Sequence, residues 1–397
     1  MSCAIGATPA ERATQGIPSA AIRKPHIAVI GHSVGAELYG AERSLLSLLA
    51  AVDRTRFDLS CVLPGTNDDY LRVIAQHTGN VTVFPYNWWT KTRPFDHEAV
   101  MRFEEVFRNG RVDLVHVNTI TLMDPLIAAR RLQVPSIVHA RELVSHDEEL
   151  ANSFGDEPMA IVDTIKAASD FIISNSDAAH RLYCKEGRSF RLYNCVDIDA
   201  FDMPNEVERG RLKIGIISSN TWKKGIDQFV QLTMLAARRQ PALEFIVIGP
   251  HNPYTDELAQ LSQRKGISAN LRFSDYVADP VEAVRQVNVV VSFSSVAESF
   301  GRTLVEGMAA RRPVITYDLG AASEIVRHGI DGFIIPPFDI GQALAHLETL
   351  ADDPSRVAAM GEAGRARAEE MFAPAVFAEN LNGIYRRILE RWEPSTR

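Results

Sequence analysis

The chain alternates short apolar runs with amphipathic helical patterns along most of its length. The runs are rich in Val and Ile and are apolar at nearly every position, as expected for parallel strands covered on both faces. Strands are predicted at 26–33, 57–63, 81–86, 113–118, 136–141 and 171–176, and again at 212–218, 244–249, 271–276, 287–293, 313–318 and 332–337. With helices such as 41–52 between them, the pattern predicts an α/β fold with parallel sheets.

The periodic pattern is interrupted once, at 201–211, where the sequence is polar, contains Pro204 and reads as a linker. We therefore expect a first Rossmann-like domain at 26–203 and a second at 204–372. Residues 1–25 are rich in small residues and are expected to form a disordered tail. Residues 373–397 contain a helix with an apolar face, which could pack on its own domain or on the first one.

The most informative stretch is 293–339, where a buried strand leads into a loop and then into a helix at 303–312. The backbone amides around Ser299, Phe300 and Gly301 are expected to be free at the start of this helix, where the helix dipole favours a phosphate group. Glu298 and Glu306 lie eight positions apart across this point. Glu298 could accept hydrogen bonds from sugar hydroxyls, and Glu306 could accept a pair from a ribose diol. The alternative is that both are solvated surface residues.

Composition narrows the function classes. The formal net charge of -8 argues against a dominant role in nucleic-acid binding. No apolar run approaches the ~20 residues that a membrane-spanning helix needs, and the first 25 residues lack the apolar core of a signal peptide. The four cysteines form no C-x-x-C pair, which suits a reducing cytoplasm. A dinucleotide dehydrogenase is disfavoured because no G-x-G-x-x-G follows the first strand.

The segment 298–332 resembles the donor-site signature of family 4 retaining glycosyltransferases, which have the GT-B fold. The chain has Glu298-x7-Glu306, then Arg-Pro-Val at 312–314, Gly-Ala-Ala-Ser-Glu at 320–324 and Gly-Ile-Asp-Gly at 329–332. Ala321 replaces a glycine of the family pattern. Further matches lie at Gly-Ala-Glu-Arg (40–43), Asn-Cys-Val-Asp (194–197) and Lys-Gly (224–225). The resemblance implies two Rossmann-like domains facing across a cleft, with 373–397 crossing back to the first domain.

The resemblance also implies roles for individual residues. Glu298, Lys224 and His139 are the expected catalytic residues, with Lys224 as the main phosphate ligand. The expected donor-binding residues are Glu306, Ser299, Phe300, Gly301, Arg302, Thr303, Lys223, Ser219 and Tyr276. On the acceptor side we expect Gly40, Glu42, Asn118 and Arg141. We expect no cofactor and no metal, because the chain's one D-x-D, at 197–199, overlaps a segment with another role in the family.

The chain departs from the family pattern just before Lys224. Family members commonly have an arginine four to six residues earlier, whereas this chain has Ser218, Ser219 and Asn220 there. These side chains can hydrogen-bond phosphate but carry no charge. Lys223 or Arg302 could compensate, and otherwise the protein would be a slow or inactive relative.

Three functions remain open. The favoured one is retaining transfer of a sugar from a nucleotide-diphosphate donor to a glycan, lipid-linked or small-molecule acceptor, in surface polysaccharide or glycoconjugate synthesis. The others are a different GT-B enzyme, such as an epimerase, and a non-catalytic nucleotide-sugar or glycan binder. The expected location is the cytoplasm, with possible contact at the inner face of the membrane. Trp88 and Trp89 could stack on a sugar, anchor to the bilayer surface or close a loop.

Overall fold

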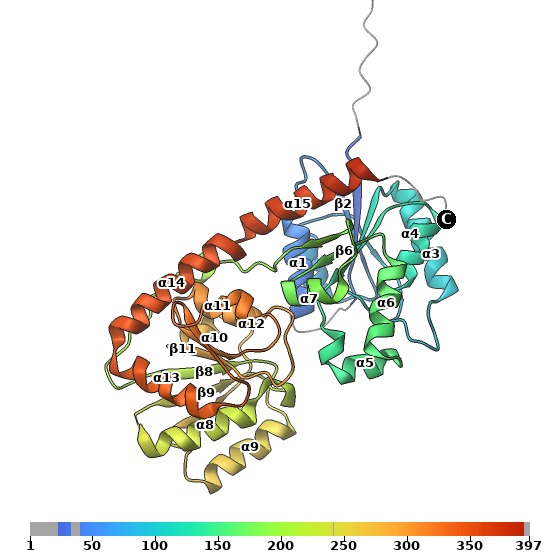
Figure 1. The fold of residues 1–397 in the computed structure, drawn as a ribbon. Coiled ribbons are helices and arrows are strands. Elements are labelled where there is room, and N and C mark those ends of the chain that lie inside the picture. Colours follow the sequence, from blue (N-terminus) through green and yellow to red (C-terminus); the bar gives the residue numbers. More distant parts are fainter. Residues whose placement is uncertain (1–22, 33–39, 241, 393–397) are drawn as a thin grey trace, which may run out of the picture.

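The computed structural model describes residues 23–32, 40–240 and 242–392, which form two α/β domains (Figure 1). A seven-stranded sheet in the order β3-β2-β1-β4-β5-β6-β7 centres the first domain, and a six-stranded sheet in the order β10-β9-β8-β11-β12-β13 centres the second. Every strand pair is parallel. The prediction of two doubly wound Rossmann-like domains is therefore confirmed. The expected tail at 1–25 lies almost entirely outside the described residues.

In the first domain, strands and helices alternate in chain order. The strands are β1 (His26–Ile30), β2 (Asp58–Leu63), β3 (Val81–Val83), β4 (Leu114–Val117), β5 (Ser136–Ala140), β6 (Phe171–Ser174) and β7 (Ser189–Arg191). The helices are α1 (Gly40–Ala51), α2 (Asp68–Ile74), α3 (His97–Gly110), α4 (Asp124–Arg131), α5 (Glu148–Phe154), α6 (Pro158–Ala168) and α7 (Asp177–Tyr183).

The second domain repeats this alternation and ends in long helices. Its strands are β8 (Lys213–Ile217), β9 (Glu244–Ile248), β10 (Leu271–Ser274), β11 (Val289–Ser292), β12 (Val314–Tyr317) and β13 (Gly332–Ile335). Its helices are α8 (Ile226–Arg239), α9 (Pro253–Arg264), α10 (Pro280–Arg285), α11 (Arg302–Ala309), α12 (Ala322–Ile325), α13 (Ile340–Asp352) and α14 (Pro354–Phe372), and α15 (Pro374–Arg391) is the last helix of the described residues.

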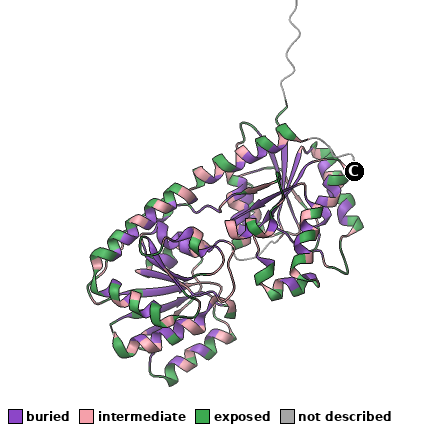
Figure 2. Ribbon diagram, in the orientation of Figure 1, coloured by how far each residue is buried: buried purple, intermediate pink, exposed green. Residues whose placement is uncertain are grey.

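The strands are buried because helices cover both faces of each sheet (Figure 2). Their Val and Ile side chains fill the space between the layers, which explains why the apolar runs located the sheets so well. Most of the predicted strands extend beyond the carboxyl end of the observed strand. The strand expected at 81–86, for example, ends at Val83. β7 was missed because Ser189–Arg191 is a short, partly exposed edge strand without an apolar run.

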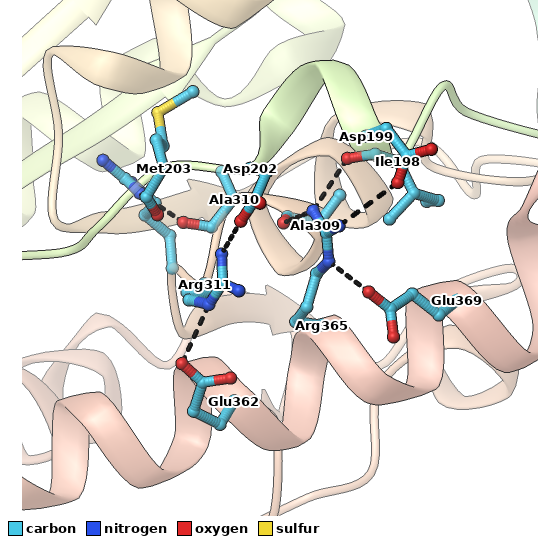
Figure 3. Close-up of polar contacts among 11 residues, drawn as sticks. Ile198, Asp199, Asp202, Met203, Ala309, Ala310, Arg311, Glu362, Arg365 and Glu369 are labelled. Atoms are coloured by element: carbon cyan, nitrogen blue, oxygen red, sulfur yellow. Dashed lines mark hydrogen bonds and ion pairs between the residues drawn. The ribbon is translucent and has the colours of Figure 1, made fainter.

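The segment between the domains is bound to the second domain rather than free (Figure 3). The guanidinium of Arg365, on α14, donates hydrogen bonds to the carbonyl of Ile198 (2.7 Å) and to that of Ala309 (3.0 Å). Arg311 pairs with Asp202 (2.6 Å) and with Glu362 of α14 (2.8 Å). These contacts begin at residue 198, so the segment is attached to the second domain earlier than the boundary at 204 that composition suggested.

The C-terminal helix α15 continues the line of α14 and packs against the first domain (Figure 1). Its apolar face joins the core beneath α1 and β1 through Phe377, Leu381, Ile384, Tyr385 and Ile388. Asn382 accepts a hydrogen bond from the amide of Asp53 and donates one to the carbonyl of Ala51. The chain passes between the domains twice, once before β8 and once between α14 and α15. The amide of Val196 donates to the carbonyl of Phe372 (3.0 Å) and so joins these two segments.

Candidate active site

A cavity of about 400 Å³ lies between the domains, at the carboxyl ends of β8 and β11. Its size is within the range of pockets that enclose small ligands. The second domain contributes most of the lining, including Ser219, Lys224, Tyr276, Glu298, Gly301, Thr303 and Glu306, while Gly40 and Arg43 come from the first domain. A second cavity of about 350 Å³ adjoins it, because both are lined by Gly40, Lys224, Glu298, Gly301 and Arg302. Open parallel sheets bind ligands at this end of their strands.

The start of α11 faces the first cavity. Gly301 precedes the helix with φ of +78°, and no side chain caps the helix terminus. A residue with a Cβ would be strained in this left-handed conformation, and the Cβ would lie 3.1 Å from Leu304 Cδ1. The first amides of a helix have no partners within the helix, so they are available to an anion in the cavity.

Two acid–cation pairs line the same cavity. Lys224 Nζ lies 2.5 Å from Glu298 Oε1, and both side chains are about one third exposed (33% and 29%). Arg43, on α1, places a terminal nitrogen 2.5 Å from Glu306 Oε1, and this pair joins the two domains. Glu306 is almost completely buried, whereas Arg43 retains 28% of its side-chain exposure. The cavity therefore presents both carboxylates and cations to a ligand.

Two glycines fix the first of these pairs. Gly225 follows Lys224 with φ of +69°, and a Cβ there would lie 2.0 Å from the carbonyl oxygen of Phe293. Gly320 has φ of +60°, and a Cβ there would lie 2.2 Å from the carbonyl oxygen of Glu298. Only glycine allows these backbone segments to approach so closely. The two positions thus hold the lysine turn and the glutamate loop against the end of β11.

Comparison with known proteins assigns each half of the chain to a family. Residues 39–200 match the model of Glycosyltransferase Family 4, and residues 198–367 match that of Glycosyl transferases group 1. The two matched segments are called the family 4 domain and the group 1 domain below, and the fold is that of GT-B glycosyltransferases. The motifs that indicated the resemblance at Gly40–Arg43 and at Glu298–Glu306 lie within these two matches.

Among solved structures, Anabaena HepE in complex with UDP and glucose is similar, with a TM-score of 0.75 at 22% identity, covering 93% of this chain and 100% of HepE. TarM superimposes with a TM-score of 0.76 at 12% identity, covering 92% of this chain and 99% of TarM. Similarity at these identities establishes the fold alone.

Curated relatives match at low identity. They include the alpha-D-kanosaminyltransferase of Streptomyces kanamyceticus (23% identical over 42% of this chain), the capsular polysaccharide biosynthesis glycosyltransferase CapM of Staphylococcus aureus (25% over 57%) and a D-inositol 3-phosphate glycosyltransferase of Thermobispora bispora (26% over 74%). The matched segments span 43%, 63% and 74% of those proteins, so the first of them is matched over less than half of its length.

Most of the expected donor residues of the group 1 domain line the cavity, but Phe300 and Ser299 have other contacts. Phe300 is buried and its ring packs against Tyr193 and Phe372, so its side chain belongs to the core. Ser299 donates from its hydroxyl to the carbonyl of Arg141 and accepts a hydrogen bond from Asn175 (3.0 Å). Both partners belong to the family 4 domain, so Ser299 contributes to the domain interface.

The expectation that Lys223 reaches the donor phosphates is not supported by its position. Its ammonium group lies 2.7 Å from carboxylate oxygens of both Asp147 and Glu149 in the family 4 domain, and it is absent from the cavity lining. Lys223 and Lys224 lie in one 3₁₀ turn, Trp222–Lys224, in which successive side chains point about 120° apart. One lysine therefore faces the cavity while its neighbour bonds the opposite domain.

His139 also differs from its expected place. Its side chain is completely buried, and it lines neither of the two cavities. Its Nδ1 lies 3.2 Å from Nε2 of His116 and 3.1 Å from a guanidinium nitrogen of Arg141, and His116 Nδ1 lies 2.7 Å from the hydroxyl of Tyr385. Burial lowers the pKa of His116 to about 3 and that of His139 well below its usual range. The two imidazoles are thus neutral and lie in the interior beside the Arg141 guanidinium.

The other acceptor-side candidates surround this cluster. Arg141 lines the second cavity and donates from Nε to Asn118 (2.9 Å) and from a terminal nitrogen to Asn194, and burial lowers its pKa to about 9. Asn118 is buried behind it. Glu42 is buried beside Tyr70, whose hydroxyl donates to the Glu42 carbonyl (3.3 Å). Gly40 lines both cavities, and residues 33–39 before it lie outside the described part of the chain.

Several residues at the interface were missed by sequence reasoning. Arg43 is the last residue of the Gly-Ala-Glu-Arg match, which was the signal for it. Glu324 accepts hydrogen bonds from the amides of Asp177 (2.6 Å) and Ala178 (2.7 Å), at the start of α7 in the family 4 domain.

The two tryptophans singled out in the sequence differ in exposure. Trp89 is buried and donates to the carbonyl of Ile120 (2.9 Å), so it is structural, while Trp88 is 40% exposed.

Within the described ranges, His, Cys, Asp and Glu side chains form no group of three or more that could hold a metal ion. In the same ranges, none of the helices combines the length and apolarity needed to cross a bilayer.

Proposed function

We propose that this chain is a retaining glycosyltransferase, which moves a sugar from a nucleotide-diphosphate donor to an acceptor hydroxyl in surface polysaccharide or glycoconjugate synthesis. The observation that carries the proposal is the cavity in which Glu298, Lys224 and Glu306 surround the open start of α11. The two family matches and the fold shared with UDP-bound HepE support it.

In the proposed reaction, the donor sugar lies beside Glu298 and the ribose beside Glu306. The bond between the sugar C1 and the diphosphate oxygen breaks, and a new bond to the acceptor oxygen forms on the same face of the sugar. The acceptor's proton passes to the departing phosphate oxygen. Lys224 and the amides of α11 stabilise the negative charge that develops on the leaving diphosphate. Since these groups meet that charge, we also propose that the reaction needs no metal.

The direct test is release of nucleoside diphosphate from a panel of UDP-, GDP- and ADP-sugars by the purified chain, in EDTA. Glu298→Ala and Lys224→Ala should each lower the rate about a hundredfold or more, the usual effect of losing one transition-state contact. The exposed residues Glu257 and Lys265 of the same domain provide matched controls, and their alanine variants should retain full activity. NMR of the product should show an unchanged anomeric configuration.

A second candidate, a protein that binds nucleotide sugars without transferring them, is favoured by one observation. The turn after β8 has no arginine, and Ser218 and Asn220 hydrogen-bond each other (2.9 Å). Calorimetry distinguishes the two. Donor binding without any diphosphate release, with or without added acceptors, would reject catalysis and establish binding alone, while absence of both would reject both functions.

A further inference from the structure

The donor cavity has a cationic side chain that has no role in the proposed reaction. Arg43 belongs to the family 4 domain, yet it lines the cavity with Lys224, Glu298 and Glu306 of the group 1 domain. It stands in the first turn of α1, and its contact with Glu306 crosses the domain interface.

The group 1 domain itself offers little positive charge to a diphosphate. Residues 218–222, the first part of the turn after β8, have only uncharged side chains: Ser218 bonds Asn220, and Asn252 donates to the backbone carbonyl of Asn220. Lys223 is bound to Asp147 and Glu149. Among the described cations of this turn, Lys224 alone faces the cavity.

Arg302 lines the cavity as well, but its guanidinium is already held in place. It donates to the carbonyl of Cys195 (3.0 Å) and to the hydroxyl of Ser44 (3.4 Å), and it is partly buried. Burial and the nearby charge of Arg43 both lower the pKa of Arg302. Both guanidinium groups line the cavity, so an anion in it could pair with two cations.

The charges along the cavity wall are unbalanced in the direction that favours an anion. The described lining carries three cations, Arg43, Lys224 and Arg302, and two carboxylates, Glu298 and Glu306. Arg43 is also the more exposed member of its pair, with 28% of its side chain accessible against 4% for Glu306. A guanidinium has five N–H donors in a fixed fork, so it can bind a carboxylate and a phosphate together or exchange one for the other.

We propose that Arg43 binds the diphosphate of the donor and supplies the charge that the turn after β8 lacks. This inference rests on the proposed function. When the donor enters, Arg43 moves from Glu306 to a phosphate oxygen, and Glu306 becomes free to accept the ribose hydroxyls. Because Arg43 and Lys224 belong to different domains, the diphosphate joins the two halves of the protein.

Calorimetric titration with UDP and with uridine shows whether a substitution removes a phosphate contact or disturbs the whole cavity, because only UDP carries the diphosphate. The same comparison is made for GDP with guanosine and for ADP with adenosine. Arg43→Gln should weaken nucleoside diphosphate binding about tenfold or more, because a charge-assisted hydrogen bond is lost, and should change nucleoside binding less than threefold. Arg43→Lys should recover part of the loss, since it restores the charge without the fork. Arg72→Gln, at an exposed arginine of the same domain, is the matched control and should bind like the wild type.

A second variant should strengthen anion binding, and it tests whether Arg43 exchanges Glu306 for a phosphate. Glu306→Gln removes the carboxylate that holds Arg43, so it should strengthen binding of inorganic pyrophosphate, and the gain should disappear in the Arg43→Gln/Glu306→Gln double variant. Equal loss of nucleoside and nucleoside diphosphate binding in Arg43→Gln, or no gain for pyrophosphate in Glu306→Gln, would overturn the role of Arg43. A wild-type chain that binds none of the three nucleoside diphosphates would instead overturn the proposed function itself.

Discussion

The two walls of the interdomain cleft contain polar clusters that differ in how far they are buried. On the group 1 side, Lys224 and Glu298 remain about one third exposed and face a cavity. On the family 4 side, His116 and His139 are completely buried, and their neighbour Arg141 lines a cavity. The group 1 cluster lies beyond the carboxyl ends of β8 and β11, whereas His116 and His139 lie within β4 and β5. The cluster buried within the strands therefore holds its domain together, whereas the cluster beyond the strand ends can contact a ligand.

The difference has a structural cause. β4 and β5 are neighbours in the middle of the seven-stranded sheet, and α15 crosses over from the other domain to cover that sheet. Tyr385 of α15 bonds His116, which bonds His139, which in turn contacts Arg141. At the group 1 wall, the start of α11 has no such cover, so the charged side chains remain in contact with solvent.

The largest stability effect is expected for Arg141→Ala. The substitution removes the donors to Asn118, Asn194 and His139 together and leaves buried acceptors unpaired. Each unsatisfied buried group costs about 1–3 kcal/mol, so the free energy of unfolding should fall by about 2–3 kcal/mol after allowing for the partial exposure of Arg141. Urea denaturation measures this. Arg188→Ala, an exposed residue of the same domain, should change it by less than about 0.5 kcal/mol. A similar small change for Arg141→Ala would show that its network contributes little.

An intermediate loss of folding stability is expected at acid pH. The folded protein keeps His116 neutral down to about pH 3, whereas an unfolded chain protonates it near pH 6.5. Its contribution to stability is therefore complete above about pH 6.5 and is lost as the pH falls toward 3, at roughly 1.4 kcal/mol per pH unit. His139 acts in the same direction. Urea curves at pH 7.5 and 5.5 should differ less for His116→Gln than for the wild type, and an equal difference would contradict the buried neutral state.

The smallest stability effect is expected at the group 1 wall. Lys224 and Glu298 form a partly exposed pair, and such pairs contribute about 0–1 kcal/mol. Glu298→Gln and Lys224→Ala should therefore shift the urea midpoint very little, although Lys224→Ala should reduce turnover about a hundredfold in the assay above. If either variant lost more than about 2 kcal/mol in the free energy of unfolding, the pair would be structural, as the His116–His139–Arg141 cluster is. The two walls of the cleft would then not differ in this respect.

Much of the fold could be predicted from the sequence because the relevant patterns are local. A parallel strand covered on both faces must be apolar at successive positions, so Val289–Ser292 and its counterparts could be located without knowing their neighbours. Strand ends were less certain, since the run at 81–86 stays apolar after the ladder ends at Val83. The left-handed conformations of Gly225, Gly301 and Gly320 were not predicted from the sequence.

The sequence by itself determined the two domains, their parallel sheets and the segment that places Glu298 before the start of α11 and Glu306 within this helix. Only the tertiary structure decided that Lys224 faces the cavity while Lys223 bonds the opposite domain, that His139 is buried beneath α15, and that Arg43 reaches Glu306 from the other half of the chain. The physical reason is that apolar periodicity specifies which face of an element is buried. The position of one domain against the other depends on contacts between residues hundreds of positions apart, which no local pattern encodes.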